Sequence, residues 1–468
     1  MQKMTLPKNV RAQFLRNFKE NFSDELIPRL LYSKDIVDYK FPFIGTVPEG
    51  VITVNSEEDI IKAIRIASNT KTILIPRGNA TAPFGGTIAH NNKGIILDLR
   101  GMKKEIDIDM FENAVICSAN MRIAEVEKIL NENGVALRFY PLIFYSATFG
   151  GWIATGGWGL GTLAYGPPEE NILNLEVITP DGNKKIIEDK EEIKLFLGSN
   201  GILGIITKVK FSLRFHSKLE YYIASYDSAN ELLKAVKRFF DLKPFSIQMF
   251  NPKQVQIFNK TFSYNLPERY LLILLKEVHY EEEKEPFFER FLNKVKETRG
   301  QIINKHYYSN IEKTQWKTME TAKITNRFSF SLVNIPILEA AKYINYLQKS
   351  IKEIRIIGTI VSKTQILLLI VFLFKDHLTK SQQRKSSSKQ FRMIQRSLKY
   401  KGSPYSTGLW FAGTYKKIYN EKQQIKLQKY VKKFENRKNI NLGKVFSTSI
   451  KKLPIRLRTL LMIITSVI

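Results

Sequence analysis

Residues 138–166 constrain the fold of this chain most, because they combine clustered aromatic side chains with closely spaced glycines. The segment has the sequence RFYPLIFYSATFGGWIATGGWGLGTLAYG. Glycine lets the backbone adopt positive φ values and lets a ligand lie directly on amide N–H groups, and successive amides in such turns form anion-binding nests. Linkers are seldom so aromatic, so we interpret the segment as phosphate-binding. A tight buried loop without a ligand is the alternative interpretation.

The same segment contains a false dinucleotide signature. Gly159–Ala164 formally matches the pattern G-x-G-x-x-[G/A]. That fingerprint requires a helix that begins within the glycines and an acidic residue about 20 positions later. Pro167 and Pro168 follow almost at once and would stop such a helix. We therefore exclude a Rossmann-type site, and the lack of a G-x-x-x-x-G-K-[ST] pattern argues against nucleoside triphosphate hydrolysis.

The sequence around this segment alternates between short strands and helices. The expected strands are Gly50–Val54, Lys71–Pro76, Gly94–Leu99, Ala114–Ala119, Ile172–Pro180 and Ile205–Leu213, and the expected helices are Ile60–Ala67 and Ile123–Asn133. Residues 8–40, ahead of them, have helical periodicity. The strand at 71–76 leads into a first glycine-rich loop at 77–87, and residues 146–157 supply a second. Two such loops can hold two phosphates, or one pyrophosphate, from both sides.

The charge balance raises a nucleic-acid hypothesis. The formal net charge is +29, and between Lys375 and Arg458 the only acidic residues are Asp376, Glu421 and Glu435. No recognised nucleic-acid-binding motif accompanies this basic run, so a solvated basic region is favoured over a specific nucleic-acid site. Such a region would also be attracted to an anionic membrane face or to an acidic partner protein.

The cysteine content and the N-terminal residues indicate in which cell compartment the protein is expected. The single cysteine, Cys117, lies in an apolar, strand-like run and is expected to be a buried thiol. One cysteine excludes a disulfide scaffold or a zinc-thiolate site. Met1–Phe22 lacks the apolar stretch of a secretory signal, so we expect a cytoplasmic protein.

The order of these segments resembles a known family. The segments IPRGNAT, GG, IILDL, YP…SATFGGWIATGG…YG, LEVITPDG and GSNGILGIIT resemble the FAD-binding domain of the vanillyl-alcohol oxidase / p-cresol methylhydroxylase type, closest to the FAD subunits of glycolate oxidase and D-lactate dehydrogenase. The resemblance implies an α+β fold, in which a two-lobed FAD-binding domain of the p-cresol methylhydroxylase type precedes an α+β cap domain with an antiparallel sheet. We therefore expect an N-terminal helical segment (1–35), an FAD-binding domain (36–216), a substrate or cap domain (217–445) and a basic, then apolar tail (446–468).

The resemblance also implies where the FAD pyrophosphate binds, between the two glycine-rich loops. The implied cofactor-binding residues are Pro76, Arg77, Gly78, Asn79, Ala80, Thr81, Gly85, Gly86, Pro141, Ser146, Ala147, Thr148, Gly150, Gly151, Ile153, Ala154, Thr155, Gly156, Gly157, Tyr165, Gly201, Gly204 and Ile205. The family usually has glycine at the position of Ala80, so a methyl group is tolerable there only with a negative φ. Covalent members attach the flavin to a histidine in the first loop, which this chain lacks. We therefore expect non-covalent FAD.

The cap sequence predicts a further series of elements. The expected strands are Leu219–Ser225, Phe245–Phe250, Gln254–Phe258, Arg269–Val278, Ser329–Ile335, Ile354–Val361 and Gln365–Phe374, and the expected helices are Ser228–Phe240 and Glu282–Thr298. Oxidation of a hydroxy acid needs a cation for the carboxylate and a group that handles the hydroxyl proton. Arg327 is the candidate for the carboxylate and Tyr405 for the flavin face, against the commoner alternatives of a surface arginine and a buried aromatic. The chain lacks the His-x-Gly-Asp-Gly-Asn-x-His motif of metal-assisted relatives, so we expect no metal site.

These features lead to the hypothesis of an FAD-dependent dehydrogenase that oxidises a small 2-hydroxy acid such as D-lactate or glycolate. The flavin would accept hydride at N5 and pass electrons to an iron–sulfur or quinone-linked partner protein. The alternative is a non-catalytic or electron-transfer flavoprotein subunit of a larger membrane-associated complex. We expect no nucleic-acid partner. Because Ile450–Ile468 is basic and then apolar, we expect peripheral contact with the inner face of a membrane.

Overall fold

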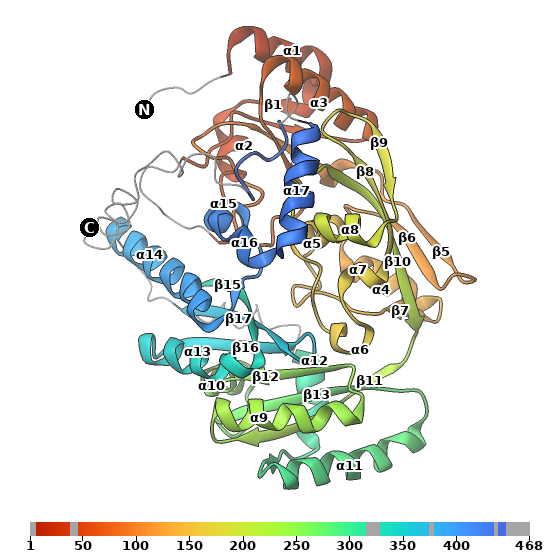
Figure 1. Cartoon of the computed structure of the whole chain (residues 1–468), viewed down its shortest axis with the longest axis vertical. Coiled ribbons are helices and arrows are strands. Elements are labelled where there is room, and N and C mark those ends of the chain that lie inside the picture. Colours follow the sequence, from red (N-terminus) through yellow and green to blue (C-terminus); the bar gives the residue numbers. More distant parts are fainter. Residues whose placement is uncertain (1–5, 38–44, 315–327, 374–378, 435–438, 446–468) are drawn as a thin grey trace.

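Three β-sheets organise the computed structural model, which describes residues 6–37, 45–314, 328–373, 379–434 and 439–445 (Figure 1). The first two sheets and their helices occupy the upper part of Figure 1, and the third sheet with its helices occupies the lower part. Helices and antiparallel sheets are thus mixed in the way that the sequence predicts, and the expected α+β fold class is confirmed.

The first sheet carries the first glycine-rich loop. Its strands, in spatial order, are β1 (Phe22–Ser23), β2 (Gly50–Thr53), β4 (Ile95–Asp98) and β3 (Leu74–Arg77), and β2, β4 and β3 run parallel. The helices around it are α1 (Lys8–Phe18), α2 (Leu26–Leu31) and α3 (Glu57–Thr70). Helix α3 begins after Ser56, whose hydroxyl accepts a hydrogen bond from the N–H of Asp59. Its apolar face packs with Phe14 and Phe18 of α1 into a core of its own.

The second sheet carries the second glycine-rich segment. Its strands are β5 (Ile106–Asp109), β6 (Ala114–Ser118), β10 (Ile205–Phe215), β8 (Ile172–Ile178) and β9 (Lys184–Ile187), with β7 (Val135–Leu137) paired to the far end of β10. The helices are α4 (Ile123–Glu132), α5 (Phe149–Thr155), α6 (Thr162–Tyr165), α7 (Pro168–Asn171) and α8 (Lys190–Phe196). Cys117 of β6 is buried, and burial raises its pKa to about 12, so the expectation of a buried thiol is confirmed.

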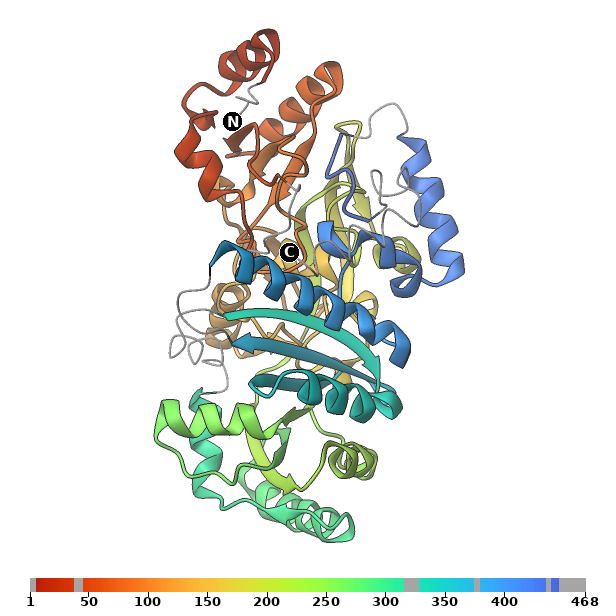
Figure 2. The same cartoon turned by 90° about the vertical axis from the view of Figure 1, so that its left-hand side faces the viewer.

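The third sheet is antiparallel and forms the cap. Its strand order is β14 (Gln301–Ile302), β11 (Lys218–Tyr226), β13 (Tyr270–Val278), β12 (Ser246–Phe250), β16 (Ile354–Ile360), β17 (Gln365–Leu373), β15 (Phe328–Pro336) and β18 (Ser403–Pro404). The helices are α9 (Ala229–Phe239), α10 (Pro252–Phe262), α11 (Lys284–Glu297), α12 (His306–Thr314), α13 (Ile337–Ser350) and α14 (Lys380–Arg396). Figure 2 shows α14 lying across the long strands of this sheet, on the side of the first two sheets.

The chain then returns from the cap to the first two sheets. Helices α15 (Gly408–Phe411), α16 (Tyr415–Ile418) and α17 (Glu421–Lys433) follow β18, and α17 contacts α8 (Figure 1). Ile440 then bridges Leu74 at the edge of the first sheet, where the N–H of Leu74 donates to the carbonyl of Asn439 over 2.7 Å. The expected cap unit, 217–445, therefore includes a segment that packs on the cofactor-binding half. Among the described helices, none has the length and apolar character needed to cross a bilayer.

Two expected elements differ from the structure. The strand expected at Gln254–Phe258 is wrong, because these residues belong to helix α10. Asn251 caps that helix by accepting the N–H of Gln254, and Pro252 occupies its first turn, where proline is favoured. The second glycine-rich segment, expected to be a loop, contains helix α5. Gly150 of this helix lies against the residue that follows β6, where an added Cβ would be 2.7 Å from the Cβ of Ala119.

Candidate FAD-binding site

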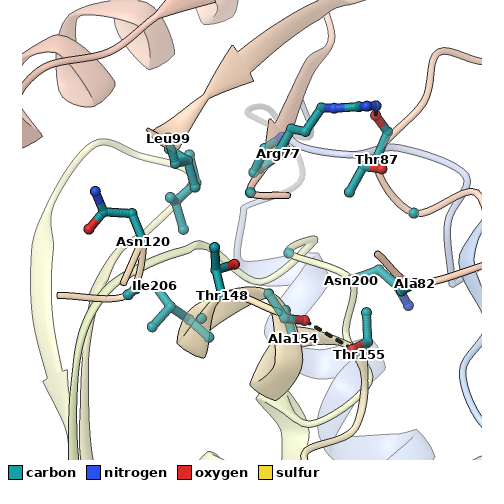
Figure 3. Close-up of a pocket in the computed structure, with 18 of the residues that line it drawn as sticks. Arg77, Ala82, Thr87, Leu99, Asn120, Thr148, Ala154, Thr155, Asn200 and Ile206 are labelled. Carbon is teal, nitrogen blue, oxygen red and sulfur yellow. Dashed lines mark hydrogen bonds between the residues drawn. The ribbon is translucent and has the colours of Figure 1, made fainter. Parts of the chain in front are cut away.

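Two adjoining cavities lie where the three sheets meet. One has a volume of about 680 Å³ and lies between the first and second sheets (Figure 3). The other, about 690 Å³, extends towards the cap. The cavities share the lining residues Gly78, Ala82, Thr87, Thr148, Gly151 and Thr155, so a ligand longer than either cavity can occupy both.

The first glycine-rich loop begins at Arg77, where β3 ends, and it forms one wall of the first cavity. The Arg77 guanidinium donates from Nη1 to the carbonyl of Thr87 over 3.2 Å and from Nη2 to the carbonyl of Lys34 over 3.0 Å. It also lies 5.0 Å from the ring centroid of Tyr32. Arg77 thus joins the beginning of the loop to its end. In Figure 3 Arg77 and Thr87 lie together on one side of the cavity, opposite Thr148 and Thr155.

The start of helix α5 forms the opposite wall, and it touches the first loop at Gly78. A Cβ atom on Gly78 would be 2.4 Å from Oγ1 of Thr148. The amide side chain of Asn79 donates to the carbonyl of Ser146 over 2.8 Å, which ties the loop to the residues that precede α5. The close approach of the two walls therefore requires glycine at position 78.

Ala80 departs from the expected backbone. Its φ is +53°, in the left-handed region, although the sequence interpretation requires a negative value. The carbonyl of Ala80 accepts a hydrogen bond from the N–H of Ile36 over 3.0 Å, and this contact fixes the peptide despite the Cβ. A left-handed conformation costs a non-glycine residue about 1–2 kcal/mol. The loop thus keeps the glycine-like conformation without the glycine.

Residues between α8 and β10, together with the returning chain, close the first cavity. Gly201, Gly204 and Ile205 line it, together with Asn200. The amide of Asn200 donates to Oγ of Ser406 over 3.1 Å and to Oγ1 of Thr407 over 3.0 Å. The cavity wall is therefore fixed by a segment more than 200 positions later in the chain.

Three buried side-chain oxygens in the first cavity have no hydrogen-bond partner within the described residues. They are Oγ1 of Thr87, Oδ1 of Asn120 and Oδ1 of Asn200. Buried polar groups in proteins are normally satisfied, by ordered water or a ligand where not by protein. Apolar surfaces beside them come from Leu99, Ala154 and Ile206 (Figure 3). The cavity therefore fits a ligand with both hydrogen-bonding and apolar parts.

Most of the residues implied in cofactor binding come together at these cavities. Those that line one or both are Pro76, Arg77, Gly78, Asn79, Ala80, Thr81, Gly86, Pro141, Ala147, Thr148, Gly150, Gly151, Ala154, Thr155, Gly201, Gly204 and Ile205. Six others do not line either cavity: Gly85, Ser146, Ile153, Gly156, Gly157 and Tyr165. The hydroxyl of Tyr165, for example, donates to Glu277 of the cap over 2.9 Å.

Further lining residues were not foreseen. They are Ala82, Phe84, Thr87, Leu99, Ala119, Asn120, Leu142, Ile143, Trp152, Trp158, Asn200, Ile206, Leu332 and Leu367. Asn200 could have been predicted from the sequence, because it lies within the glycine-rich cluster Gly198–Gly204. No local sequence pattern could have predicted Leu332 and Leu367, because they reach the cavity from strands of the third sheet.

The second cavity reaches the cap at Tyr405. The Tyr405 hydroxyl oxygen accepts a hydrogen bond from the N–H of Trp158 over 2.9 Å, so its own proton is available to a ligand. Burial raises the pKa of Tyr405, so the phenol stays protonated at neutral pH. Leu332 of β15 and Leu367 of β17 line the cavity beside it. Arg327, the other candidate catalytic residue, lies outside the described residues.

Comparison with known families identifies the ligand. Residues 48–186 match the family described as "FAD binding domain". The chain contains an FAD-binding domain. The match covers the first glycine-rich loop and most of the second sheet, and the expected family and the expected cofactor, FAD, are both confirmed. The polar and apolar lining of the two cavities is consistent with this cofactor.

Relatives of this FAD-binding protein have several activities. Glycolate oxidase subunit GlcD of Bacillus subtilis is 26% identical over 43% of this chain and 44% of that protein. The mitochondrial D-lactate dehydrogenase [cytochrome] of Arabidopsis thaliana is 26% identical over 45% of this chain and 37% of its own length. Alkyldihydroxyacetonephosphate synthase of Dictyostelium discoideum is 23% identical over 54% of this chain and 44% of its own length. The chain thus spans less than half the length of these curated relatives.

Solved structures resemble the fold over nearly the whole chain. An alkyldihydroxyacetonephosphate synthase has a TM-score of 0.71 at 15% identity, covering 93% of this chain and 86% of that one. p-Cresol methylhydroxylase with substrate bound has a TM-score of 0.72 at 12% identity, covering 94% and 98%. At these identities the likeness concerns the fold alone.

Proposed function

We propose that this protein is an FAD-dependent dehydrogenase that oxidises the CH–OH group of a small 2-hydroxy acid such as D-lactate or glycolate. The observation that carries the proposal is the second cavity, in which loop residues 79–81 of the FAD-binding domain meet Leu332, Leu367 and Tyr405 of the cap side. A substrate bound there would be covered by the cap and would lie beside the cofactor. The hydroxy-acid relatives named above support the choice of substrate class.

The residues of this chain supply binding and orientation. The flavin, when bound, supplies the hydride acceptor. Tyr405 acts as a hydrogen-bond donor to a substrate oxygen, because its oxygen already accepts from Trp158 and its pKa is raised. Its role is therefore to orient the hydroxyl or carboxylate, and the hydroxyl proton must pass to a base that is not among the described lining residues of this cavity. The apolar walls at Leu332 and Leu367 exclude water from the same space.

The test is a flavin spectrum followed by a substrate screen. Purified protein is expected to show the two absorption bands of flavin, with the colour released into the supernatant on acid precipitation because the FAD is non-covalent. Anaerobic addition of D-lactate, glycolate or another 2-hydroxy acid should bleach the long-wavelength band. A flavin-loaded protein that no 2-hydroxy acid bleaches would refute the proposed substrate class. A colourless protein that takes up no added FAD would favour the structural-subunit alternative.

A second candidate is the synthesis of an alkyl-dihydroxyacetonephosphate. The observation that favours it is the lining of the second cavity, in which the described residues include Phe84, Leu142, Ile143 and Leu367 but no charged side chain. Such a surface suits an alkyl chain better than a carboxylate. A long-chain alkyl dihydroxyacetone phosphate that changes flavin fluorescence at lower concentration than any 2-hydroxy acid would support this candidate.

We also propose that the reduced protein passes electrons to an iron–sulfur or quinone-linked protein in the cytoplasm, at the inner face of the membrane. The basic sequence between Lys375 and Arg458 supports membrane contact by charge. Cosedimentation with vesicles should then require anionic lipid and disappear in high salt. Equal binding to neutral vesicles would contradict an electrostatic contact.

A further inference from the structure

The end of the first glycine-rich loop is held by two buried charged side chains from distant parts of the chain. The Asp35 carboxylate accepts the N–H of Gly85 over 2.8 Å and the N–H of Val37 over 2.9 Å. The Lys444 ammonium donates to the carbonyls of Gly85 over 2.8 Å and Ile88 over 2.5 Å. Asp35 thus binds the amide of Gly85 while Lys444 binds its carbonyl. We call Asp35 and Lys444 the Gly85 clamp.

The clamp continues directly into the wall of the first cavity. Gly86 and Thr87, which line that cavity, lie between the two carbonyls that Lys444 binds. Asn441, one turn before Lys444, donates to the carbonyl of Gly86 over 2.8 Å and also to the carbonyl of Asn200. The turn at 441–444 therefore connects the first loop to the wall that Asn200 forms on the other side of the cavity.

Both members of the clamp are almost fully removed from solvent. Lys444 is 1% exposed and Asp35 is 6% exposed. Burial raises the pKa of Asp35 to about 7 and lowers the pKa of Lys444 to about 7, and the opposite charge of each partner partly offsets the effect. The Arg77 charge also lowers the pKa of Asp35. The pKa of His90 is lowered by burial first and then by the charge of Lys444. Isolated charges at such depth are costly, so each side chain depends on the other.

We propose that Asp35 and Lys444 are positioning residues for FAD, whose buried charges fix residues 85–88 and make the affinity for FAD fall as pH rises above neutral. The direction of the pH effect follows from the charges that the clamp carries above neutral pH. As pH rises through about 7, Lys444 loses its proton and its charge-assisted hydrogen bonds to Gly85 and Ile88 weaken. Asp35 loses its own proton over the same range and is left as a carboxylate without a charged partner. A negative charge then lies behind the loop that the family resemblance implies for the anionic pyrophosphate of FAD, and that charge would oppose binding.

The test measures the FAD dissociation constant of the full chain between pH 6 and 9, by titrating the apoprotein with FAD and following flavin fluorescence. Lys444→Met should raise the dissociation constant about tenfold at pH 6.5, as expected for loss of buried charged hydrogen bonds. The pH dependence that remains should be that of Asp35 alone, with its midpoint at higher pH, because the Lys444 charge no longer lowers the pKa of Asp35. The matched control is Lys190→Met, because Lys190 donates to the carbonyl of Ile172 over 2.6 Å, has its pKa lowered by burial and lines neither cavity. The control should match the natural protein in affinity and in pH profile.

Asp35→Asn keeps the test decisive if Lys444→Met does not fold. The amide oxygen of asparagine can still accept the N–H of Gly85, but the charge that stabilises the Lys444 ammonium is gone. Lys444 should then lose its proton at lower pH, so the midpoint at which FAD affinity weakens should move to more acidic pH. An unchanged midpoint in Asp35→Asn, or natural affinity and pH dependence in a folded Lys444→Met, would overturn the proposal.

Discussion

Gly78→Ala should weaken FAD binding by bringing the first loop and helix α5 into collision. The φ of Gly78 is not in the left-handed region, so alanine is compatible with the backbone and only the new methyl group matters. That methyl would be 2.4 Å from Oγ1 of Thr148 and 3.5 Å from its Cβ and Cγ2. Contacts below 3.0 Å are essentially never seen, so either the Thr148 hydroxyl must turn away from its present position or the two walls of the cavity must separate.

The magnitude follows from the single offending atom. Overpacking of this kind costs about 1–3 kcal/mol. If this cost falls entirely on the FAD complex and not on the apoprotein, the dissociation constant increases about 5- to 140-fold. In a Thr148→Ala background the nearest remaining atom of residue 148 is its Cβ at 3.5 Å, an ordinary contact. There, the added Gly78→Ala change should cost less than about 0.5 kcal/mol.

The assay is a double-mutant cycle on FAD affinity. Dissociation constants are measured by fluorescence titration for the natural chain, Gly78→Ala, Thr148→Ala and the double variant. The matched control is Gly413→Ala, since no atom lies within 4 Å of a Cβ at that position. We expect a coupling energy of about 1–3 kcal/mol between positions 78 and 148. If Gly78→Ala costs the same with and without the Thr148 hydroxyl, the geometric reasoning is wrong.

Three other perturbations test separate features of the structure. Ala80→Gly should stabilise the protein by up to about 1 kcal/mol, because release of the left-handed strain exceeds the extra chain entropy of glycine; a lower melting temperature would contradict this. Tyr405→Phe should lower kcat/KM for the substrate about 10- to 100-fold while the flavin spectrum is retained. The control is Tyr226→Phe, which removes a buried phenol hydrogen-bonded to a threonine of the cap and should leave kcat/KM unchanged. Equal effects of the two changes would show that Tyr405 is not part of the site. Burial raises the pKa of Glu127 from 4.5 to about 7, so the folded state binds more protons between these pH values and the free energy of unfolding falls as pH rises from 4.5 to 7. Glu127→Gln should abolish this pH dependence in denaturant unfolding. An unchanged pH dependence would show that Glu127 is not its source.

Local patterns predicted much of the FAD-binding half. The helix expected at Ile60–Ala67 is observed as Glu57–Thr70, and its start is marked by the Ser56 cap and three acidic residues, which act over a few residues. The helix expected at Ile123–Asn133 is observed as α4, and it ends just before Gly134, whose φ of +74° is the conformation that glycine permits. In both cases the determining interactions lie within one helical turn of the residue concerned.

Errors arose where a short apolar pattern suited two structures. Val255, Ile257 and Phe258 fit a strand as well as a helix face, and the decisive signal was the Asn251-Pro252 pair before them. Ala80 was misjudged for another reason, because an alanine in place of the family's glycine suggested a negative φ. A hydrogen bond from distant Ile36 instead accompanies a left-handed backbone there.

The remaining site residues depend on contacts that no local pattern encodes. Leu332 and Leu367 reach the cavity from adjacent strands β15 and β17, whose register sets Leu332 opposite Leu369 and Leu367 opposite Asn334. Lys444 reaches the first loop because the chain returns from the cap. Both placements follow from the pairing of distant segments, which a single sequence does not reveal.

The return of the chain to the first sheet has a consequence for biosynthesis. Strand β3 lies at an edge of that sheet, and Asn439 binds beside it, its amide donating to the carbonyl of Ala67 across a separation of 372 residues. At typical translation rates of about 5–20 residues per second, this edge stays uncovered for roughly 20–70 s after its own synthesis. An exposed strand edge invites pairing with other chains. The nascent FAD-binding domain should therefore need chaperone protection on the ribosome, and cofactor loading should follow release.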